Sequence, residues 1–158
     1  MGILAEITAW MAVNSEGIHG TRPWQICGEG PSLEGAVRDT SAFKLLPAIP
    51  DTSPGATRSA GSPDSGHQPF TAQDVRFTAK GDALYAFVML WPESRAAMIK
   101  SLASNLPLVA GRKVTKVSLL GYGGKLEWSQ TTDGLAVKLP EKAPGEHAVT
   151  LRIKGLLA

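Results

Sequence analysis

Two β-prone runs joined by a short loop constrain this chain more than any other part of its sequence. The first, Ala72–Ala79, alternates apolar and polar residues with the period of two that is typical of a half-buried strand. The second, Ala83–Trp91, is apolar throughout, which favours a strand covered on both faces. Pro92 ends this run because proline has no N–H for a strand ladder. Gly81 lies in the loop between the runs and tolerates positive φ, so we predict a β-hairpin.

Shorter apolar and polar alternations follow the hairpin, with turn residues between them. The predicted strands are Met98–Leu102, Val114–Leu120, Leu126–Trp128, Leu135–Leu139 and Val149–Ile153. Short strands at this spacing are typical of an antiparallel sandwich. We therefore predict a mainly-β fold, an antiparallel β-sandwich with Greek-key or jelly-roll-like connections.

The N-terminal residues have a different period. Ile3, Leu4, Ile7, Trp10 and Met11 recur at the spacing of one helix face, so a short amphipathic α-helix should precede the strands. Such an apolar stripe needs a partner surface. The helix is expected to fold back on the sandwich, pair with another copy of the chain, or bind a segment that this chain lacks.

The chain divides into two parts at this level of analysis. Residues 1–24 form the helix and a linker, and residues 25–158 form the β-sandwich domain, since 158 residues suit a single core. Glycines and prolines punctuate Asn14–Gly35, which we expect to be irregular. Residues 47–69 are rich in Pro, Gly and Ser and poor in apolar residues, so we expect a mobile loop there.

Charge and composition exclude several classes of function. The net charge is only +2 and no run of Lys or Arg occurs, which argues against nucleic-acid and membrane partners. Three histidines and one cysteine lack metal-ligand spacing, so we expect no metal, no cofactor and no internal disulfide. The N-terminus has no basic segment typical of a signal peptide. Location is therefore unknown, with the cytoplasm as the default expectation.

Two motifs resemble one known family. Residues 70–92 are similar to the start of the C-terminal β-sandwich of glycoside hydrolase family 29, the α-L-fucosidases. Trp10–Trp24 resembles the segment that leaves the last barrel helix of that family, where the pattern includes Asn-Gly-Glu-x-Ile-Tyr-x-Thr-Arg-Pro-Trp. Ser15 and His19 depart from it, since the family usually has Gly and Tyr there. Both motifs match in order and spacing, and the similarity covers nearly the whole chain.

The resemblance implies a part of an enzyme without its catalytic residues. In that family the nucleophile, the acid/base and the sugar-binding His and Trp residues belong to a (β/α)8 barrel, and a barrel needs about 250 residues. None of those motifs occurs in this chain. The implied role is an accessory, structural or sugar-binding C-terminal domain. Its implied partners are the missing barrel domain or a second copy, together with a fucosylated glycan or fucoside.

An alternative is a small self-sufficient α-L-fucosidase whose site forms at an oligomer interface. A retaining glycosidase needs two carboxyl groups about 5–5.5 Å apart. The candidate catalytic residues are Glu16, His19 and Glu29, which lie between the helix and the sandwich. The structural interpretation of the same segment is that Asn14 caps the helix, Glu16 pairs with Arg22, and His19 packs in place of the family Tyr.

A second alternative is a carbohydrate-binding module. Trp24, Tyr122 and Trp128 are the candidate residues, because aromatic rings stack on sugar faces. Trp24 and Tyr122 fall in predicted loops and are better placed for a surface platform. Trp128 shares a strand face with Leu126, which favours a position in the core.

Overall fold

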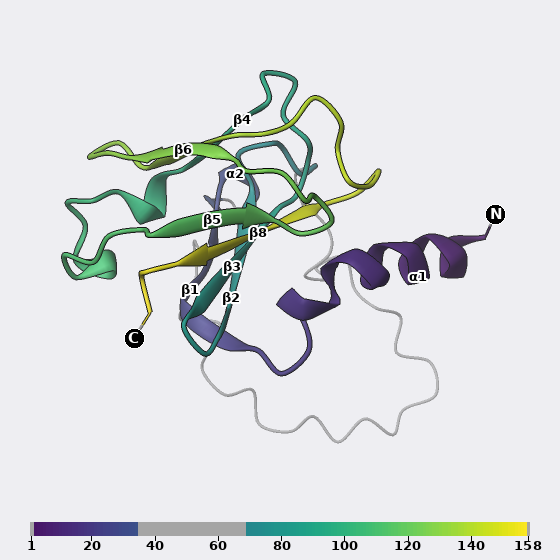
Figure 1. The fold of residues 1–158 in the computed structure, drawn as a ribbon, viewed down its shortest axis with the longest axis horizontal. Helices are drawn as coiled ribbons and strands as arrows, with labels where there is room; N and C mark the ends of the chain where they lie inside the picture. Colours follow the sequence, from purple (N-terminus) through teal and green to yellow (C-terminus); the bar gives the residue numbers. More distant parts are fainter. Residues whose placement is uncertain (1, 35–68, 158) are drawn as a thin grey trace, which may run out of the picture.

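The computed structural model describes residues 2–34 and 69–157. Two antiparallel sheets pack face to face, and helix α1 extends from one side of them (Figure 1). The predicted antiparallel sandwich with one N-terminal helix is therefore confirmed. Most of the predicted loop over residues 47–69 lies outside the described residues.

The larger sheet has five strands in the order β1-β2-β3-β8-β5. Their bounds are β1 Arg22–Glu29, β2 Val75–Lys80, β3 Ala83–Val88, β5 Lys116–Leu119 and β8 Val149–Lys154. The predicted hairpin is β2–β3, in which Val75 lies opposite Val88 and Lys80 opposite Ala83. Gly81 takes a φ of 57° in its turn. All six residues of β3 are buried, as its unbroken apolar run predicted.

The smaller sheet has three strands in the order β4-β7-β6. Their bounds are β4 Ala96–Ile99, β6 Glu127–Gln130 and β7 Leu135–Lys138. The prediction of a strand at Met98–Leu102 was partly wrong, because Lys100–Leu102 forms the 3₁₀ turn η3. The Glu29 carboxylate accepts hydrogen bonds from the N–H groups of Lys100 and Ser101, and these bonds support the turn in place of a strand ladder.

Strand β1 corrects the prediction that Asn14–Gly35 is irregular. It pairs antiparallel with β2, and the register shifts between Pro23 and Gly28. A side chain at Gly28 would collide with the Val75 carbonyl, so glycine permits the close approach of the two strands. The proline and glycines were interpreted as turn signals, whereas here they mark an irregular strand pairing. Besides η3, the described residues hold three short helical segments: η1 Ser15–Gly17, α2 Pro31–Glu34 and η4 Pro107–Val109.

The hydrophobic core lies between the two sheets. Leu84 and Leu151 from the larger sheet and Ile99 and Leu135 from the smaller sheet are fully buried in it. A second, smaller cluster covers the outer face of β3, where Tyr85 and Phe87 pack against the end of α1. This explains why β3 is apolar on both faces.

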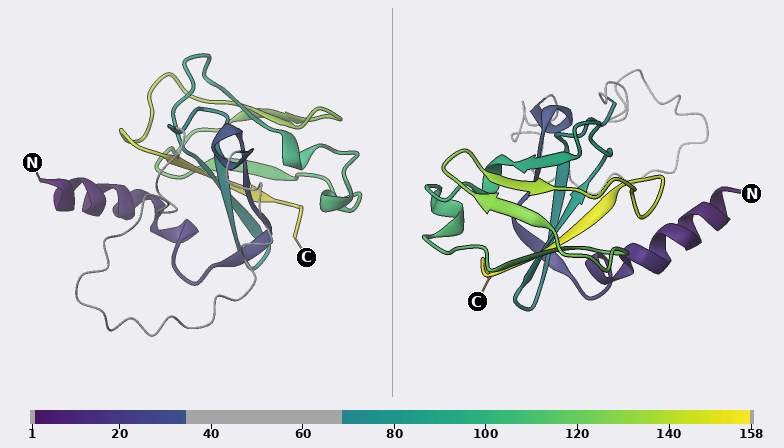
Figure 2. Two further views of the ribbon diagram at one scale, coloured as in Figure 1. Left: turned by 180° about the vertical axis from the view of Figure 1, so that it is seen from behind. Right: turned by 45° about the horizontal axis from the view of Figure 1, so that its top comes forward.

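Helix α1, Ile3–Asn14, confirms the predicted helix, and among the described residues it is buried against the sheets at its C-terminal end, at Asn14. The Trp10 indole N–H donates to the Ala148 carbonyl at 2.6 Å, and the Thr150 hydroxyl donates to Asn14 Oδ1 at 2.7 Å. The N-terminal half extends away from the sheets (Figures 1 and 2). Ile3 and Leu4 there are 75% and 80% exposed. Among the described residues, no helix has the length and apolar character needed to span a membrane.

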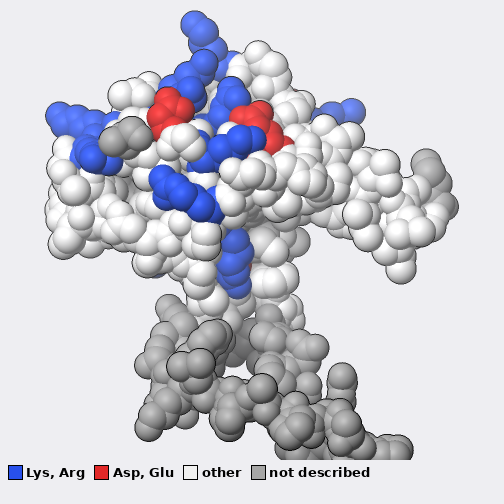
Figure 3. Space-filling view, turned by 90° about the horizontal axis from the view of Figure 1, so that it is seen from below, with Lys and Arg blue, Asp and Glu red and all other residues white. Residues whose placement is uncertain are grey.

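Positive charge gathers on one side of the molecule. Lys and Arg outnumber Asp and Glu on the face seen in Figure 3. Strand register brings cations together that are far apart in the sequence, since Lys116 lies opposite Lys154 across β5 and β8. The Asp82 carboxylate lies 3.3 Å from the Lys154 ammonium and offsets part of this repulsion.

Candidate functional site

Glu16 lies at the joint between α1 and the larger sheet. Its Oε1 accepts hydrogen bonds from the Tyr85 hydroxyl at 2.6 Å and from Arg152 Nη1 at 2.8 Å. These two bonds hold the pKa of Glu16 below its usual value. Burial, followed by the Glu16 carboxylate, raises the pKa of Tyr85 to about 12. An ionised carboxylate with two donors is a structural anchor, and it has no proton to supply as a general acid near neutral pH.

The predicted ion pair between Glu16 and Arg22 is wrong. Arg22 is exposed at the start of β1, and Arg152 on β8 takes its place. The sequence holds no signal for this partner, because Arg152 reaches Glu16 only through the order of the strands. The predicted helix cap is wrong, since Ser15 caps α1 through its N–H to the Met11 carbonyl. Asn14 is the last residue of the helix, and its Nδ2 donates to the Trp10 carbonyl at 3.0 Å.

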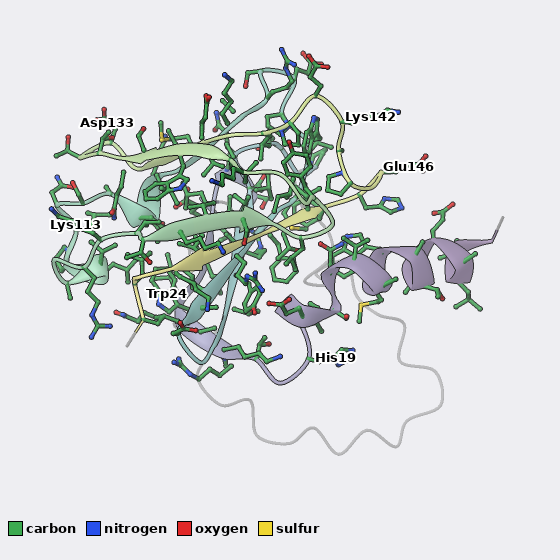
Figure 4. The ribbon with its side chains drawn as sticks, viewed as in Figure 1. His19, Trp24, Lys113, Asp133, Lys142 and Glu146 are labelled. Atoms are coloured by element: carbon green, nitrogen blue, oxygen red, sulfur yellow. The ribbon has the colours of Figure 1, made fainter. Side chains whose placement is uncertain are left out.

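The other two candidate catalytic residues have separate surroundings. His19 is exposed and its side chain points away from the sheets (Figure 4). The two carboxylate oxygens of Glu29 accept the N–H groups of Lys100 at 2.8 Å and Ser101 at 2.6 Å. Glu16 therefore contacts β3 and β8, whereas Glu29 contacts the start of η3, so the two carboxylates have different partners.

Asp74 is a buried carboxylate, although the alternation predicted for Ala72–Ala79 puts it on the polar face, turned to solvent. Its Oδ1 accepts the Ser32 N–H at 2.9 Å, and its Oδ2 accepts the Thr71 N–H at 2.7 Å. Burial raises the pKa of Asp74, but the hydrogen bonds from Ser32 and Thr71 outweigh burial and keep the pKa below its usual value. Strand alternation misled the prediction because β2 begins only at Val75. Thr71, three residues before Asp74, was the available signal of a local turn.

Trp24 is not available as a sugar platform. Its side chain is only 8% exposed, and its ring packs edge-on against Phe77 with centroids 5.1 Å apart. Figure 4 shows it among the strands of the larger sheet. We predicted that Trp24 lies in a loop, but it belongs to β1 and its side chain packs in the core. Sequence reasoning missed this because it did not predict β1.

Tyr122 and Trp128, by contrast, line the same open groove. The groove has a volume of about 970 Å³ and lies along the smaller sheet, with Ala96, Ala136 and Lys138 also on its wall. Tyr122 is 39% exposed, and Trp128 is half-buried against the core. The structure therefore brings together two of the three predicted aromatic residues.

Two ion pairs lie in this groove. Lys138 Nζ is 3.0 Å from Glu127 Oε2, and Arg95 Nη1 is 3.4 Å from Glu141 Oε1. Each cation is thus matched by a carboxylate. All four side chains are more than half exposed, so they remain open to hydrogen bonds with a ligand.

A second surface surrounds the free half of α1. Trp10 separates two small hollows of about 210 and 340 Å³, and Ile3 and Ile7 line the second of them. The Glu6 carboxylate lies 3.6 Å from His147 Nε2 across this surface. We call Ile3, Leu4 and Ile7 the α1 surface. Neither this surface nor any other described part of the chain groups three potential metal ligands.

The fold and the sequence now allow comparison with known proteins. Residues 68–154, just over half of the chain, match the family described as alpha-L-fucosidase C-terminal domain. The chain belongs to this family. Its matched part runs from the β2–β3 hairpin to β8, and so includes the smaller sheet and every strand of the larger sheet except β1.

Longer relatives match over a wider range. Human tissue alpha-L-fucosidase is 25% identical over 97% of this chain and 24% of its own length. The Branchiostoma floridae alpha-L-fucosidase is 23% identical over 98% of this chain and 25% of its own length. The structure of Thermotoga maritima alpha-fucosidase shares the fold at a TM-score of 0.54 and 15% identity, over 91% of this chain and 24% of that one. This chain spans about a quarter of these relatives and corresponds to their C-terminal part without a catalytic barrel.

Proposed function

We propose that this chain is a non-catalytic accessory domain that docks through the α1 surface onto the catalytic part of an α-L-fucosidase. The exposed face of α1 carries this proposal. Ile3, Leu4 and Ile7 are 75%, 80% and 52% exposed on one short helix, with apolar hollows beside them. Contiguous exposed apolar residues of this kind mark interaction surfaces.

Energetics support a protein partner for this surface. Complete burial of a Leu or Ile side chain is worth about 1.5–3 kcal/mol, so three such residues can drive a substantial part of a domain contact. Glu6 and His147, 3.6 Å apart, would form the polar margin. The relatives support the choice of partner, because their similarity includes α1 while three quarters of their length lies outside this chain.

The carboxylates of the joint support a structural role. Glu16 is engaged by Tyr85 and Arg152, and Glu29 caps η3. Each is already used as a hydrogen-bond acceptor within the domain. A pair of carboxyl groups free to act as nucleophile and acid/base is therefore expected from the partner domain.

A chimera tests the proposal directly. This chain would replace the C-terminal part of human tissue alpha-L-fucosidase, to which it aligns over 97% of its length. We expect the chimera to hydrolyse an aryl α-L-fucoside, and we expect Leu4→Glu with Ile7→Glu to abolish the folded, active product. Lys113→Glu is the matched control, since it adds the same charge at the end of the molecule away from α1 (Figure 4). Equal loss in the control, or no loss in the double variant, would contradict docking through α1.

The second candidate is a self-sufficient α-L-fucosidase assembled at an oligomer interface. The observation that favours it is the Glu6–His147 pair beside the α1 surface, because self-association there would bring carboxylates of two copies together. The same fucoside assay, performed on size-fractionated chain alone, separates the two candidates. Turnover that co-elutes with an oligomer and disappears in Glu6→Gln would replace the docking proposal. An absence of turnover in every fraction is the expected result.

A further inference from the structure

We infer that the groove lined by Tyr122 and Trp128 binds a neutral oligosaccharide. This site goes beyond the docking proposal. Its lining residues include none of those around α1, so either proposal can fail alone. In Figures 1 and 2 the smaller sheet and α1 lie in different parts of the molecule.

The groove has the shape needed for flat sugar rings. The outward face of the smaller sheet combines the small residues Ala96, Ser129 and Ala136 with the longer side chains of Met98, Glu127 and Lys138. Small side chains on a twisted sheet leave a shallow channel along its surface. The volume of about 970 Å³ is at the upper end of the range for small-molecule sites.

The two aromatic residues supply the contact surface. A pyranose ring has an apolar C–H face and a rim of hydroxyl groups. Tyr122 and Trp128 match this character, because each ring is apolar and carries one polar group. Tyr122 is the exposed ring of the two. Trp128 lies opposite the buried Val137 on the inward face of the sheet, so it lines the groove from the core side and is fixed there by its contact with the core.

Gly124 holds the Tyr122 ring in position. A side chain at residue 124 would collide with atoms of that ring, so the ring lies directly across the Gly124 backbone. The Tyr122 N–H also donates to the Leu119 carbonyl at 3.2 Å, which closes the turn after β5. A ring that is held before a ligand arrives loses less conformational entropy on binding.

Charge decides which kind of glycan fits. Arg95 and Lys138 are each paired with a carboxylate, so the groove has two cations, two anions and no net charge. Hydroxyl groups both donate to carboxylates and accept from cations, and such charged hydrogen bonds are stronger than neutral ones. An acidic glycan would meet Glu127 and Glu141 as well as the two cations, so its charge gains no net attraction in this groove. A neutral oligosaccharide meets complementary partners only.

Titration calorimetry on the whole chain tests this site. The probes are lactose and 2′-fucosyllactose as neutral sugars and a sulfated chondroitin disaccharide as the acidic one. We expect weak binding of at least one neutral sugar and none of the acidic disaccharide. Tyr122→Ala should weaken the affinity at least about fivefold, as expected for loss of an aromatic contact residue.

Two further variants keep the test decisive. Gly124→Val should weaken binding by a similar factor, because the added side chain displaces the Tyr122 ring while leaving its chemistry intact. Phe70→Ala is the control, since Phe70 is 50% exposed but lies outside the groove. Failure of both neutral sugars to bind, preference for the acidic disaccharide, or unchanged affinity in both groove variants would overturn the inference.

Discussion

The α1 surface and the groove are both exposed, but they differ in chemistry and in the contacts that hold them in place. The α1 surface presents large aliphatic side chains on the free half of a helix. The groove presents aromatic rings and paired charges on a three-stranded sheet. Aliphatic groups without polar neighbours favour a protein partner, whereas rings beside hydrogen-bonding groups favour a small polar ligand. Exposure alone would have assigned the two regions the same role.

Different parts of the fold hold the α1 surface and the groove in place. The helix depends on a few contacts at its C-terminal end, chiefly those of Trp10, Asn14 and Glu16. The groove rests on strands whose inward residues, such as Leu135 and Val137, belong to the main core. The turn that carries Tyr122 touches α1 through Leu120 and Gly121, which pack near Trp10 and Val13. Changes at Trp10 should therefore leave the strands of the groove intact, and this separation can be tested.

Trp10→Ala should have the largest effect. The variant removes the hydrogen bond to Ala148 and the ring contact with Phe87, whose centroid is 6.2 Å away. Because Trp10 is only half-buried, we expect a loss of about 2–3 kcal/mol in the free energy of unfolding, below the 3–5 kcal/mol typical of a fully buried ring. Denaturant unfolding measures this loss. Ile3→Ala, on the exposed half of the same helix, should change stability by less than about 0.5 kcal/mol.

Sugar binding by the Trp10→Ala protein tests whether the α1 surface and the groove are independent of each other. Affinity for the neutral sugar should equal that of the unchanged chain, because Trp10 does not line the groove. A parallel loss of sugar affinity would show that the two regions are coupled, and the distinction between them would be abandoned.

Acid should reduce the stability that Glu16 contributes at the joint between α1 and the larger sheet. This loss should be smaller than that caused by Trp10→Ala. The folded pKa of Glu16 lies below 4.5, so its stabilising contribution is present at neutral pH and is lost as the pH falls through that lowered value. Since Glu16 and Arg152 are partly exposed, we expect only about 0.2–1 kcal/mol. The stability difference between the unchanged chain and Glu16→Gln should therefore be present at pH 7 and shrink as the pH falls through the lowered pKa of Glu16.

Unfolding curves of both proteins across this pH range provide the measurement. Asp74 also has a lowered pKa and contributes acid sensitivity to both proteins, so only their difference reports on Glu16. Glu93→Gln is the control, because Glu93 is an exposed carboxylate outside the joint. A difference that grows as the pH falls would contradict the assigned sign.

Lys138→Met should have the smallest effect on stability. Its ion pair with Glu127 is largely exposed, and such pairs contribute about 0–1 kcal/mol. The variant leaves the groove with a net negative charge and one cationic donor fewer. We therefore expect nearly unchanged unfolding together with weaker binding of the neutral sugar in calorimetry. Unchanged sugar affinity would show that the paired charges do not take part in recognition.

Local sequence patterns predicted the elements of this protein well. The period of two around Phe77, the unbroken apolar run of β3 and the glycine between them predicted the hairpin, because these signals act within one strand and one turn. Helical spacing predicted α1, and two motifs indicated the family. The pattern failed at β1, where Pro23 and Gly28 were interpreted as turn residues although they belong to an irregular strand.

The candidate site was harder to predict, since it depends on partners that are distant in the chain. Trp24 and Tyr122 looked alike in the sequence, yet β1 buries the first and a turn exposes the second. Tyr122 and Trp128 were both named, but only the structure placed them in one groove.

The sequence by itself determined most of the strands, though not β1, together with the helix and the family, because periodicity, turn residues and motifs are local properties. Only the tertiary structure decided that Glu16 pairs with Arg152, that Lys116 lies opposite Lys154, and that the groove has no net charge. These relations follow from the order β3-β8-β5 in one sheet and β4-β7-β6 in the other. Strand order and register join residues across the whole chain, and no local pattern encodes them.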